Sequence, residues 1–258
     1  PADVAPGDFW DCVSANRLAA LMNLRFAVTG PSLRWGHVLK RFEHAYQANL
    51  IHAFRHLAAA EDADARLRRA GIECLWIRGP FAGAGLYGDA GVRCFSDLDL
   101  LAPEARRRSA YETLESMGYK PPVFSLPRRF FEKHHLHWRV ESPSGIVCEL
   151  HWAFDHPYKL HRVDYDAVFR EARRRTADRF AWNEPGPDHL LLAACMHLSK
   201  HCRLPPGAAD DAGFLRDIAG RGWLTHWLDV LMILRRHGAE LDWDRIPAMA
   251  DAWRVKES

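Results

Sequence analysis

Two long segments before residue 71 carry apolar residues at helical spacing. One runs from about Phe9 to Ala27 and the other from about Trp35 to Ala70, with a break expected near Glu61. Apolar positions three and four residues apart form one face of an α-helix. Gly30-Pro31-Ser32 separates the segments, and Gly71 occupies the position of a helix C-terminal cap. We predict two amphipathic helices whose apolar faces pack against another part of the chain.

Between residues 71 and 185 the apolar residues form short runs, which are typical of strands. The expected strands run from Cys74 to Ile77, Leu98 to Leu101, Tyr119 to Phe124, His134 to Val140 and Ile146 to Trp152. A helix of small residues after Gly79 joins the first two strands, and another helix from about Pro103 to Met117 follows them. This order of elements predicts a mixed α/β sheet.

Helical spacing returns after residue 186 and is strongest from Leu190 to Cys202 and from Trp223 to His237. A loop at residues 203–211, rich in proline and glycine, is expected to be mobile. The chain therefore divides into an N-terminal helical section (1–70), an α/β core (71–185) and a C-terminal helical section (186–258). The predicted fold class is α/β (α+β), with a mixed sheet between two helical sections.

The composition is that of a globular protein and excludes several classes. Of 258 residues, 35 are basic and 33 acidic, so no strong overall charge attracts nucleic acid or an anionic membrane. No apolar run reaches the ~18 to 20 residues that a membrane span needs, and no secretory signal is visible. The six cysteines contain no CxxC pair, so reduced thiols are expected. We predict a cytoplasmic protein without a membrane partner.

Two carboxylates, Asp97 and Asp99, stand two residues apart where the second apolar run begins. Alternation along a strand places both on one face. Neighbouring carboxylates repel unless a cation lies between them, and their oxygens suit Mg²⁺ or Mn²⁺. An isolated pair of this kind is most often an exposed part of an edge strand. Glu149 favours a metal site instead, because a charge inside an apolar run is costly to bury without a partner.

If the strand of Glu149 lies beside that of Asp97 and Asp99, three carboxylates converge. Such a set can hold two divalent ions about 3.5 to 4 Å apart, an arrangement used for displacement at phosphorus. We therefore predict two Mg²⁺ (or Mn²⁺) ions on these residues.

A strand-to-helix turn at Arg78 and Gly79 precedes the carboxylates. A helix N-terminus offers free backbone N–H groups to a phosphate, and glycine permits its close approach, although such a turn usually marks only a change of direction. Arg93 precedes the first carboxylate by four residues, and ion pairing is an equally plausible role for it. The candidate nucleotide-binding residues are Arg78, Gly79, Arg93 and Ser96.

Several histidines accompany these candidates. His151 shares the strand face of Glu149, and His197 and Lys200 lie on a C-terminal helix; all three are candidates for contacting substrate or supporting a metal ligand. Zinc at the histidines of the sheet region is less favoured, because no thiolate or carboxylate has the accompanying spacing. His197 and His201 share a helix face, but a packed or substrate-facing role is more common than metal binding.

Several motifs occur in the order and spacing of a known family. They are Ile72 to Gly79, Leu86 to Asp89, Gly91 to Arg93, Ser96 to Leu101, Met117 to Tyr119 and Glu149 to Trp152, followed by helices around His197 to His201 and Trp227 to Asp229. Over roughly Ala45 to Trp243 the sequence resembles the uncharacterised bacterial nucleotidyltransferase family of the polymerase β superfamily.

The resemblance implies a minimal nucleotidyltransferase sheet, metal ligands at Asp97 and Asp99, a third acidic ligand at Glu149, and nucleotide phosphates near Gly79. The sequence departs from the family pattern at Arg78, where a lysine is usual, and an arginine cannot donate a proton in turnover. Pro80 also removes a backbone N–H donor at the start of the helix.

The function that the resemblance implies is metal-dependent transfer of a nucleoside monophosphate from a nucleoside triphosphate, the expected substrate, to an acceptor hydroxyl. A small molecule, peptide or saccharide is favoured as acceptor over nucleic acid, given the near-neutral charge. Two alternatives stay open. In the first, the protein has the same fold but is inactive and senses nucleotide or binds a partner, which the departures at Arg78 and Pro80 suggest. In the second, it transfers the nucleotide to an RNA end.

Overall fold

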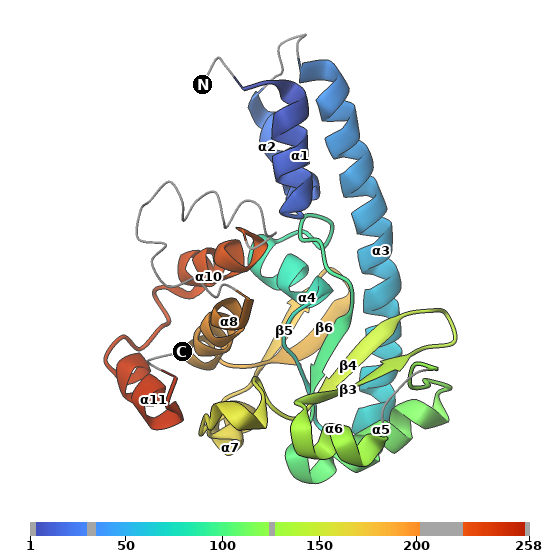
Figure 1. The fold of residues 1–258 in the computed structure, drawn as a ribbon, viewed down its shortest axis with the longest axis vertical. Coiled ribbons are helices and arrows are strands. Elements are labelled where there is room, and N and C mark those ends of the chain that lie inside the picture. Colours follow the sequence, from blue (N-terminus) through green and yellow to red (C-terminus); the bar gives the residue numbers. More distant parts are fainter. Residues whose placement is uncertain (1–3, 30–34, 124–126, 202–223, 256–258) are drawn as a thin grey trace.

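The computed structural model describes residues 4–29, 35–123, 127–201 and 224–255 of the chain. The N-terminal section contains α1 (Pro6–Ala15), α2 (Ala19–Thr29) and α3 (Gly36–Arg69). Figure 1 shows α1 and α2 beside the first turns of α3, which then runs down one side of the molecule to the sheet. The loop expected to be mobile at residues 203–211 lies outside the described residues.

The structure corrects both predicted N-terminal helices. The segment from Phe9 to Ala27 is two helices, because Arg17 adopts a left-handed conformation with φ 58° between α1 and α2. The predicted break near Glu61 is wrong: α3 is continuous over 34 residues. Its buried face continues past Glu61 through Ala63 and Leu67, so packing against the core supports the helix beyond that point.

Gly71 ends α3 as predicted. Its φ of 69° is left-handed, and its N–H bonds the carbonyl of Arg68 while the N–H of Ile72 bonds that of Leu67. This pair of bonds is a Schellman motif, which satisfies carbonyls left free at a helix end and favours glycine at the left-handed position. The turn feeds the chain directly into the first strand.

The central sheet has four strands in the order β1-β2-β4-β3. They are β1 (Leu75–Trp76), β2 (Leu98–Leu101), β4 (Val147–His151) and β3 (His137–Glu141). The β1–β2 and β3–β4 pairs are antiparallel, and the central β2–β4 pair is parallel. The prediction of a mixed sheet is confirmed.

Short helices connect the strands and a second small sheet completes the core. Between β1 and β2 lie α4 (Pro80–Ala82) and the π-helix η2 (Gly83–Tyr87); after β2 come the 3-10 helix η3 (Glu104–Arg106), α5 (Arg107–Ser116) and α6 (Arg128–His134). The 3-10 helix η4 (Pro157–Lys159), α7 (Tyr165–Arg170) and the hairpin of β5 (Arg173–Ala177) and β6 (Phe180–Glu184) follow β4. The C-terminal section contains α8 (Pro187–His201), α10 (Leu224–His237) and α11 (Arg245–Trp253).

Two predicted strands differ from the structure. Within the described part of Tyr119 to Phe124, pairing is limited to one bridge between Lys120 and Glu141. The segment predicted from His134 begins three residues too early, because His134 ends α6 and β3 starts at His137. The β5–β6 hairpin was not predicted, since its first strand reads Arg173-Arg174-Arg175 and lacks the apolar residues that mark a strand.

The faces of the sheet pack against different helices. Leu98, Leu100, Cys148 and Leu150 belong to a hydrophobic core that also contains α3 side chains from Ala53 to Leu67. Leu101 belongs to a second core with side chains of α8, α10 and α11. The division of the chain at residue 70 stays a prediction, although the C-terminal half of α3 packs in the same core as the sheet.

A buried ion pair joins the C-terminal helices to the loop before β2. Arg93 donates from Nε and Nη2 to both carboxylate oxygens of Asp229 on α10, at 2.8 and 2.6 Å. The hydroxyl of Tyr87 donates to the same carboxylate at 3.0 Å. The side chains of Arg93 and Asp229 are only 6% and 11% exposed, so each charge depends on the other for compensation.

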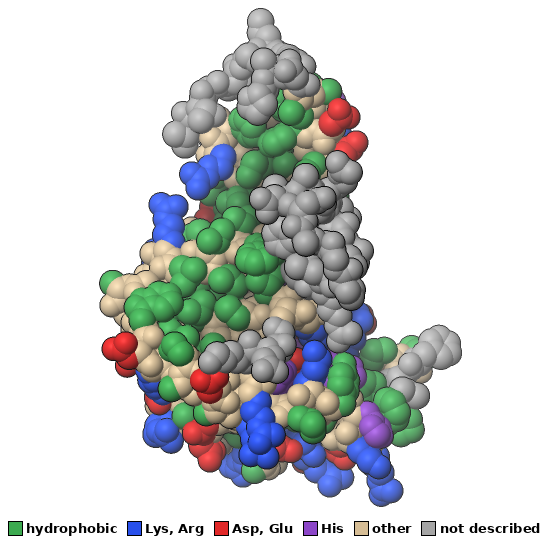
Figure 2. Space-filling model, turned by 60° about the vertical axis from the view of Figure 1, so that its left-hand side comes forward, with side chains coloured by type: hydrophobic (Ala, Val, Ile, Leu, Met, Phe, Trp, Pro, Cys, Tyr) green, Lys and Arg blue, Asp and Glu red, His purple; other side chains and the backbone are tan. Residues whose placement is uncertain are grey.

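Figure 2 views the side on which the C-terminal helices lie, and hydrophobic side chains gather there. Trp227 and Leu231, one turn apart on α10, are 36% and 54% exposed. Among the described helices, none combines the length and the apolar character of a transmembrane span.

We expect Asp229→Asn to lower the free energy of unfolding by about 3 kcal/mol, because it leaves the charge of Arg93 buried without a counter-ion. Urea unfolding followed by circular dichroism measures the change. The matched control is Asp62→Asn on the exposed face of α3, which should change stability by less than about 0.5 kcal/mol. Equal effects of the two variants would show that the pair does not stabilise the fold.

Candidate active site

The three predicted carboxylates lie at one end of the central strand pair. β2 and β4 run parallel with Asp99 directly opposite Glu149, and Asp97 precedes β2 by one residue. Leu98 and Leu100 point into the core on the other face, so alternation leaves Asp97 and Asp99 on the same side. The adjacency of the two strands, on which the predicted cluster depended, is therefore present.

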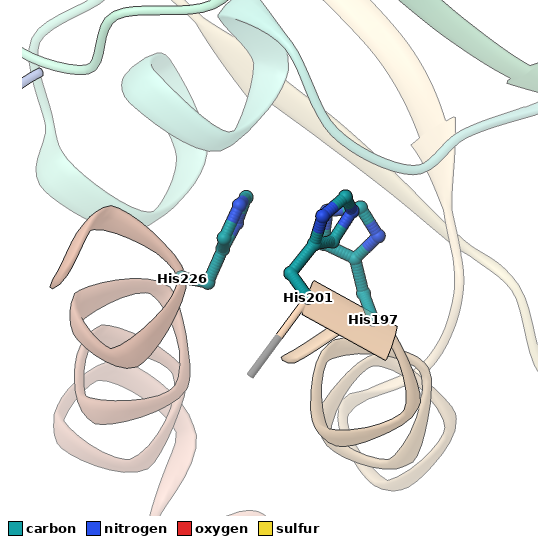
Figure 3. A group of neighbouring side chains, drawn as sticks. All are labelled: His197, His201 and His226. Carbon is teal, nitrogen blue, oxygen red and sulfur yellow. The ribbon is translucent and has the colours of Figure 1, made fainter. Parts of the chain in front are cut away.

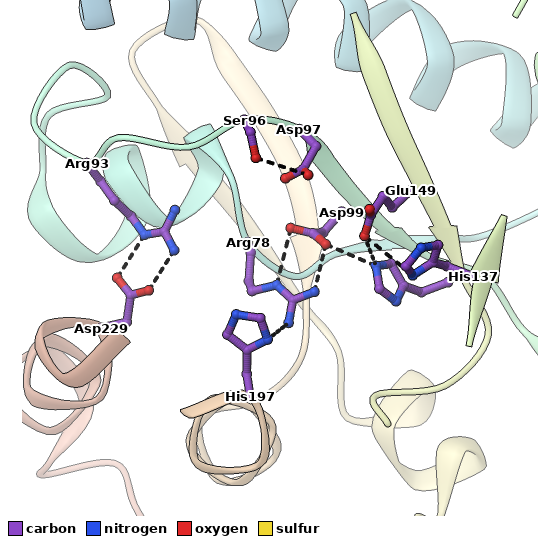
Figure 4. A network of polar contacts seen from close by, with 10 residues as sticks. Arg78, Arg93, Ser96, Asp97, Asp99, His137, Glu149, His197 and Asp229 are labelled. Carbon is purple, nitrogen blue, oxygen red and sulfur yellow. Dashed lines mark hydrogen bonds and ion pairs between the residues drawn. The ribbon is translucent and has the colours of Figure 1, made fainter. Parts of the chain in front are cut away.

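Asp99 is the most strongly held of the three carboxylates. Arg78 donates to it from Nη2 and Nε, at 2.7 Å to Oδ1 and 3.2 Å to Oδ2, and His151 Nε2 lies 3.0 Å from Oδ1 (Figure 4). Burial opposes the charge of Asp99, but Arg78 and His151 outweigh that effect and hold its pKa well below the usual value. Asp99 is therefore a carboxylate with a fixed orientation.

Arg78 links the sheet to α8. Its third nitrogen, Nη1, donates to Nδ1 of His197 at 2.7 Å, so all three guanidinium nitrogens have protein partners (Figure 4). The sequence led us to expect Arg78 to hold a phosphate. The structure shows it bonded to Asp99, and its role toward nucleotide stays a prediction.

Asp97 has a different environment from Asp99. Its Oδ2 accepts a hydrogen bond from Ser96 Oγ at 3.1 Å, and the side chain is half-buried. Burial, followed by repulsion from Asp99 and Glu149, raises the pKa of Asp97 to about 6. The group therefore holds its proton more tightly than an ordinary aspartate.

Glu149 is flanked by two imidazoles. Its Oε2 lies 3.4 Å from His151 Nε2 and 3.4 Å from His137 Nδ1 on the neighbouring strand β3. Burial lowers the pKa of His151, but its hydrogen bonds to Asp99 and Glu149 raise it overall. His151 thus bridges two of the carboxylates and limits their movement. The sequence singled out His151 but did not place His137 here.

At Gly79, the chain that leaves β1 packs closely against the backbone of Asp97, just before β2. Its φ is 69°, and a Cβ built on it would lie 2.8 Å from the carbonyl oxygen of Asp97. Such a conformation and contact require glycine. The predicted helix after it starts with Pro80 and is only a three-residue α-helical turn continued by a π-helix. The phosphate-binding role of Gly79 stays a prediction.

Helix α3 holds the irregular loop that leads to Asp97. Asn49 Nδ2 donates to the carbonyls of Gly91 and Arg93 at 2.7 and 3.1 Å, and Tyr46 OH donates to Asp89 at 2.9 Å. The two Asn49 contacts satisfy loop carbonyls that have no strand partner. The sequence gave no reason to assign Tyr46 and Asn49 to the site, because both read only as polar positions of an amphipathic helix.

The candidate residues line one cavity of about 550 Å³. Every predicted site residue contributes to its wall, namely Arg78, Gly79, Arg93, Ser96, Asp97, Asp99, Glu149, His151, His197 and Lys200. Arg17, from the turn between α1 and α2, and His226, from α10, also line it. The structure thus brings together all three sections of the chain at this cavity.

The carboxylates fit a divalent cation in charge and chemistry. Arg78 pairs directly with Asp99, and repulsion from Asp99 and Glu149 adds to burial in raising the pKa of Asp97. Oxygen donors of this kind are the ones that Mg²⁺ or Mn²⁺ prefers. However, the three carboxylates are not among the groups whose donor atoms all lie within 4.8 Å; in the described ranges these are His137–Glu149–His151 and His197–His201–His226.

Comparison with known proteins gives one match over almost the whole chain. A family model described as uncharacterised nucleotidyltransferase matches residues 3–258. No curated protein matches the sequence.

Three solved structures resemble the chain at low identity. The solution structure of the antibiotic-resistance factor ANT(2'')-Ia is 15% identical with a TM-score of 0.44, covering 81% of this chain and 92% of that one. Its crystal structure with adenylyl-2''-tobramycin is 13% identical with a TM-score of 0.47, covering 78% and 98%. An antigenic nucleotidyltransferase-like protein from Paracoccidioides brasiliensis is 14% identical with a TM-score of 0.32, covering 83% and 94%. Likenesses of this degree carry no argument about activity.

We expect Asp97→Asn to stabilise the metal-free protein at pH 7.5 by about 1 kcal/mol. Because the pKa of Asp97 is raised in the folded state, the folded protein binds this proton more tightly than the unfolded chain. The parent therefore loses stability as the pH rises from about 4 through 6, a loss that asparagine does not share. Urea unfolding in a chelator at pH 4, 5.5 and 7.5 measures it. A difference independent of pH would contradict the raised pKa.

Proposed function

The chain belongs to the uncharacterised nucleotidyltransferase family, and from that membership we propose that it transfers a nucleoside monophosphate from a nucleoside triphosphate to an acceptor hydroxyl in a metal-dependent reaction. One observation carries the proposal: Asp99 and Glu149 lie in register on adjacent parallel strands, with Asp97 beside them, on the wall of a shared cavity. Convergent carboxylates on a rigid sheet are suited to binding divalent ions and the phosphates they accompany.

Asp97, Asp99 and Glu149 are the residues that would hold two Mg²⁺ or Mn²⁺ ions. When bound, such ions neutralise charge on the phosphates and activate the acceptor hydroxyl. In the reaction the acceptor oxygen bonds to the α-phosphorus, the bond to the pyrophosphate oxygen breaks, and the hydroxyl proton leaves. We propose that Glu149, which lies between the imidazoles of His137 and His151, receives that proton.

The surrounding residues orient the ligands. Arg78 and His151 fix the two oxygens of Asp99, which limits the rearrangement needed when a substrate binds. His197 fixes Arg78 in turn, so its proposed role in supporting the site acts through that residue. This chain of contacts explains how arginine can replace the lysine expected at position 78: it serves geometry and charge, without proton transfer.

The phosphates have cationic and polar partners elsewhere on the cavity wall. Lys200 and Arg17 line it from α8 and from the α1–α2 turn, and Ser96 lies next to Asp97. The bidentate pair with Asp229 uses Nε and Nη2 of Arg93, so Nη1 is not part of that pair. We propose that Lys200, Ser96 and Arg93 face the triphosphate, with the Gly79 turn allowing a close approach of its backbone.

The acceptor proposed here is a small molecule, a saccharide or a peptide side chain. A cavity of about 550 Å³ lies within the range of about 300 to 1,000 Å³ that is usual for small-molecule sites. The chain carries a formal charge of only +2, which offers little general attraction for RNA.

We also propose that the protein acts in the cytoplasm. Its described cysteines are free thiols, and the pKa values of Cys74 and Cys148 are raised by burial, so both are unreactive packing residues. Unpaired thiols are typical of a reducing compartment.

Calorimetric titration of each nucleoside triphosphate, with and without Mg²⁺, tests the proposal first. The parent should bind at least one nucleotide only when Mg²⁺ is present. Asp97→Asn and Asp99→Asn should abolish this metal-dependent binding, because each removes a charge from the proposed ligand set. Asp62→Asn is the matched control and should bind as the parent does.

The second measurement is pyrophosphate release with sugar, peptide and RNA acceptors. Asp97→Asn and Asp99→Asn should reduce the rate by a factor of about a hundred or more. Nucleotide binding without release for any acceptor would favour a nucleotide-sensing protein. Absence of nucleotide binding by the folded parent would refute the proposed function and favour a partner-binding role. Release with RNA alone would move the acceptor to nucleic acid.

A further inference from the structure

Three histidines outside the carboxylate cluster meet between the C-terminal helices. His197 and His201 are four residues apart on α8, and His226 projects from the first turn of α10 toward them (Figure 3). The ring centroids lie 4.5, 4.7 and 4.9 Å apart, and one donor nitrogen from each ring lies within 4.8 Å of the others. Two helices thus present three imidazoles to one point.

The imidazoles are in the state that metal binding requires. Burial is the first cause that lowers the pKa of all three rings, to about 4 for His226, so the rings are neutral at pH 7. Neutral imidazole has one lone pair available for a metal ion. Nδ1 of His226 is buried and has no hydrogen-bond partner among the described residues, which is costly unless something occupies it.

We propose that His197, His201 and His226 bind a transition-metal dication, Zn²⁺ being the biological candidate, with a fourth coordination position open to the cavity. Three imidazoles plus one exchangeable position is a known pattern of zinc binding, whereas Mg²⁺ prefers oxygen ligands. All three histidines line the cavity, so an anionic ligand can reach the fourth position. The site is separate from the proposed carboxylate metals and does not depend on nucleotide transfer.

The metal competes with Arg78 for His197. The guanidinium can only donate, so Nδ1 of His197 accepts its hydrogen bond and the proton of the neutral ring resides on Nε2. A ring in this tautomer has no second lone pair. Zn²⁺ therefore displaces Arg78 from His197, either by binding Nδ1 directly or by binding Nε2 after the proton moves to Nδ1. Binding at this site consequently frees the Arg78 side that faces α8.

The second group of converging donors is the alternative location for zinc. His137, Glu149 and His151 also have donor atoms within 4.8 Å, but His151 is already engaged with both Glu149 and Asp99. In the α8–α10 group, His201 and His226 form no ion pair with another described residue, so only the Arg78 contact must be replaced.

The test is a metal titration of the chelator-stripped full chain. Zn²⁺ affinity is measured by competition with a chromophoric chelator, and Co²⁺ is used as a second probe through the visible absorption of the bound ion. We expect one high-affinity equivalent per chain. His201→Gln, on an exposed position, and His226→Gln should each weaken Zn²⁺ binding at least about tenfold. Circular dichroism and thermal unfolding establish that each variant is folded.

His137→Asn is the matched control, because it removes an imidazole from the alternative group. Its Zn²⁺ affinity should stay within about twofold of the parent. Loss of binding in His137→Asn with full binding in His201→Gln would overturn the proposal and place zinc on the sheet. Absence of tight Zn²⁺ and Co²⁺ binding by the parent would also overturn it.

Arg78→Gln gives a result that misfolding cannot imitate. It removes both the competitor for His197 and a nearby positive charge, so Zn²⁺ should bind several times more tightly than to the parent. Unchanged or weaker binding by the folded variant would reject the competition between the metal and Arg78.

Discussion

The contact between Arg78 and Asp99 is the interaction around which the rest of the site is arranged. It joins the end of β1 to the centre of β2, and through His197 it extends to α8. A buried carboxylate is tolerated only when charge and hydrogen bonds compensate its lost hydration. Arg78 and His151 supply that compensation, so the orientation of Asp99 is part of the stability of the fold. The same contact brings a C-terminal helix to the end of the sheet.

A second buried pair does the same for α10. Arg93 leaves the loop before β2 and meets Asp229, while α3 holds that loop from its other side through Asn49. Asn16, between α1 and α2, is fully buried, and its carbonyl accepts a hydrogen bond from Thr225 at the start of α10. The cavity therefore lies where the helical sections meet the edge of the sheet, and the ion pairs Arg78–Asp99 and Arg93–Asp229 hold the sections together there. Movement of any one section would alter the shape of the cavity.

In the two proposals above, one cavity holds two chemically different sets of metal donors. The carboxylates of the sheet suit hard ions such as Mg²⁺, and the imidazoles of α8 and α10 suit borderline ions such as Zn²⁺. Arg78 lies between the sets and bonds to both Asp99 and His197. Occupation of either set therefore changes the contacts that Arg78 can make to the other. In this chain an arginine at that position acts as a physical connection between two donor sets.

The sequence by itself determined the strands that carry Asp97, Asp99 and Glu149 and their common facing, because strand alternation and the cost of a lone buried charge are local properties. It also determined the cap at Gly71, where a left-handed turn needs glycine. The split between α1 and α2, the continuity of α3 and the arginine-rich hairpin strand β5 depended on packing against distant segments. Only the tertiary structure decided the partners of Arg78 and Arg93, and only it brought His226 to His197 and His201. A side chain's pairing partner is set by which helices dock on the sheet, and sequence spacing does not say which segments, separated along the chain, come into contact.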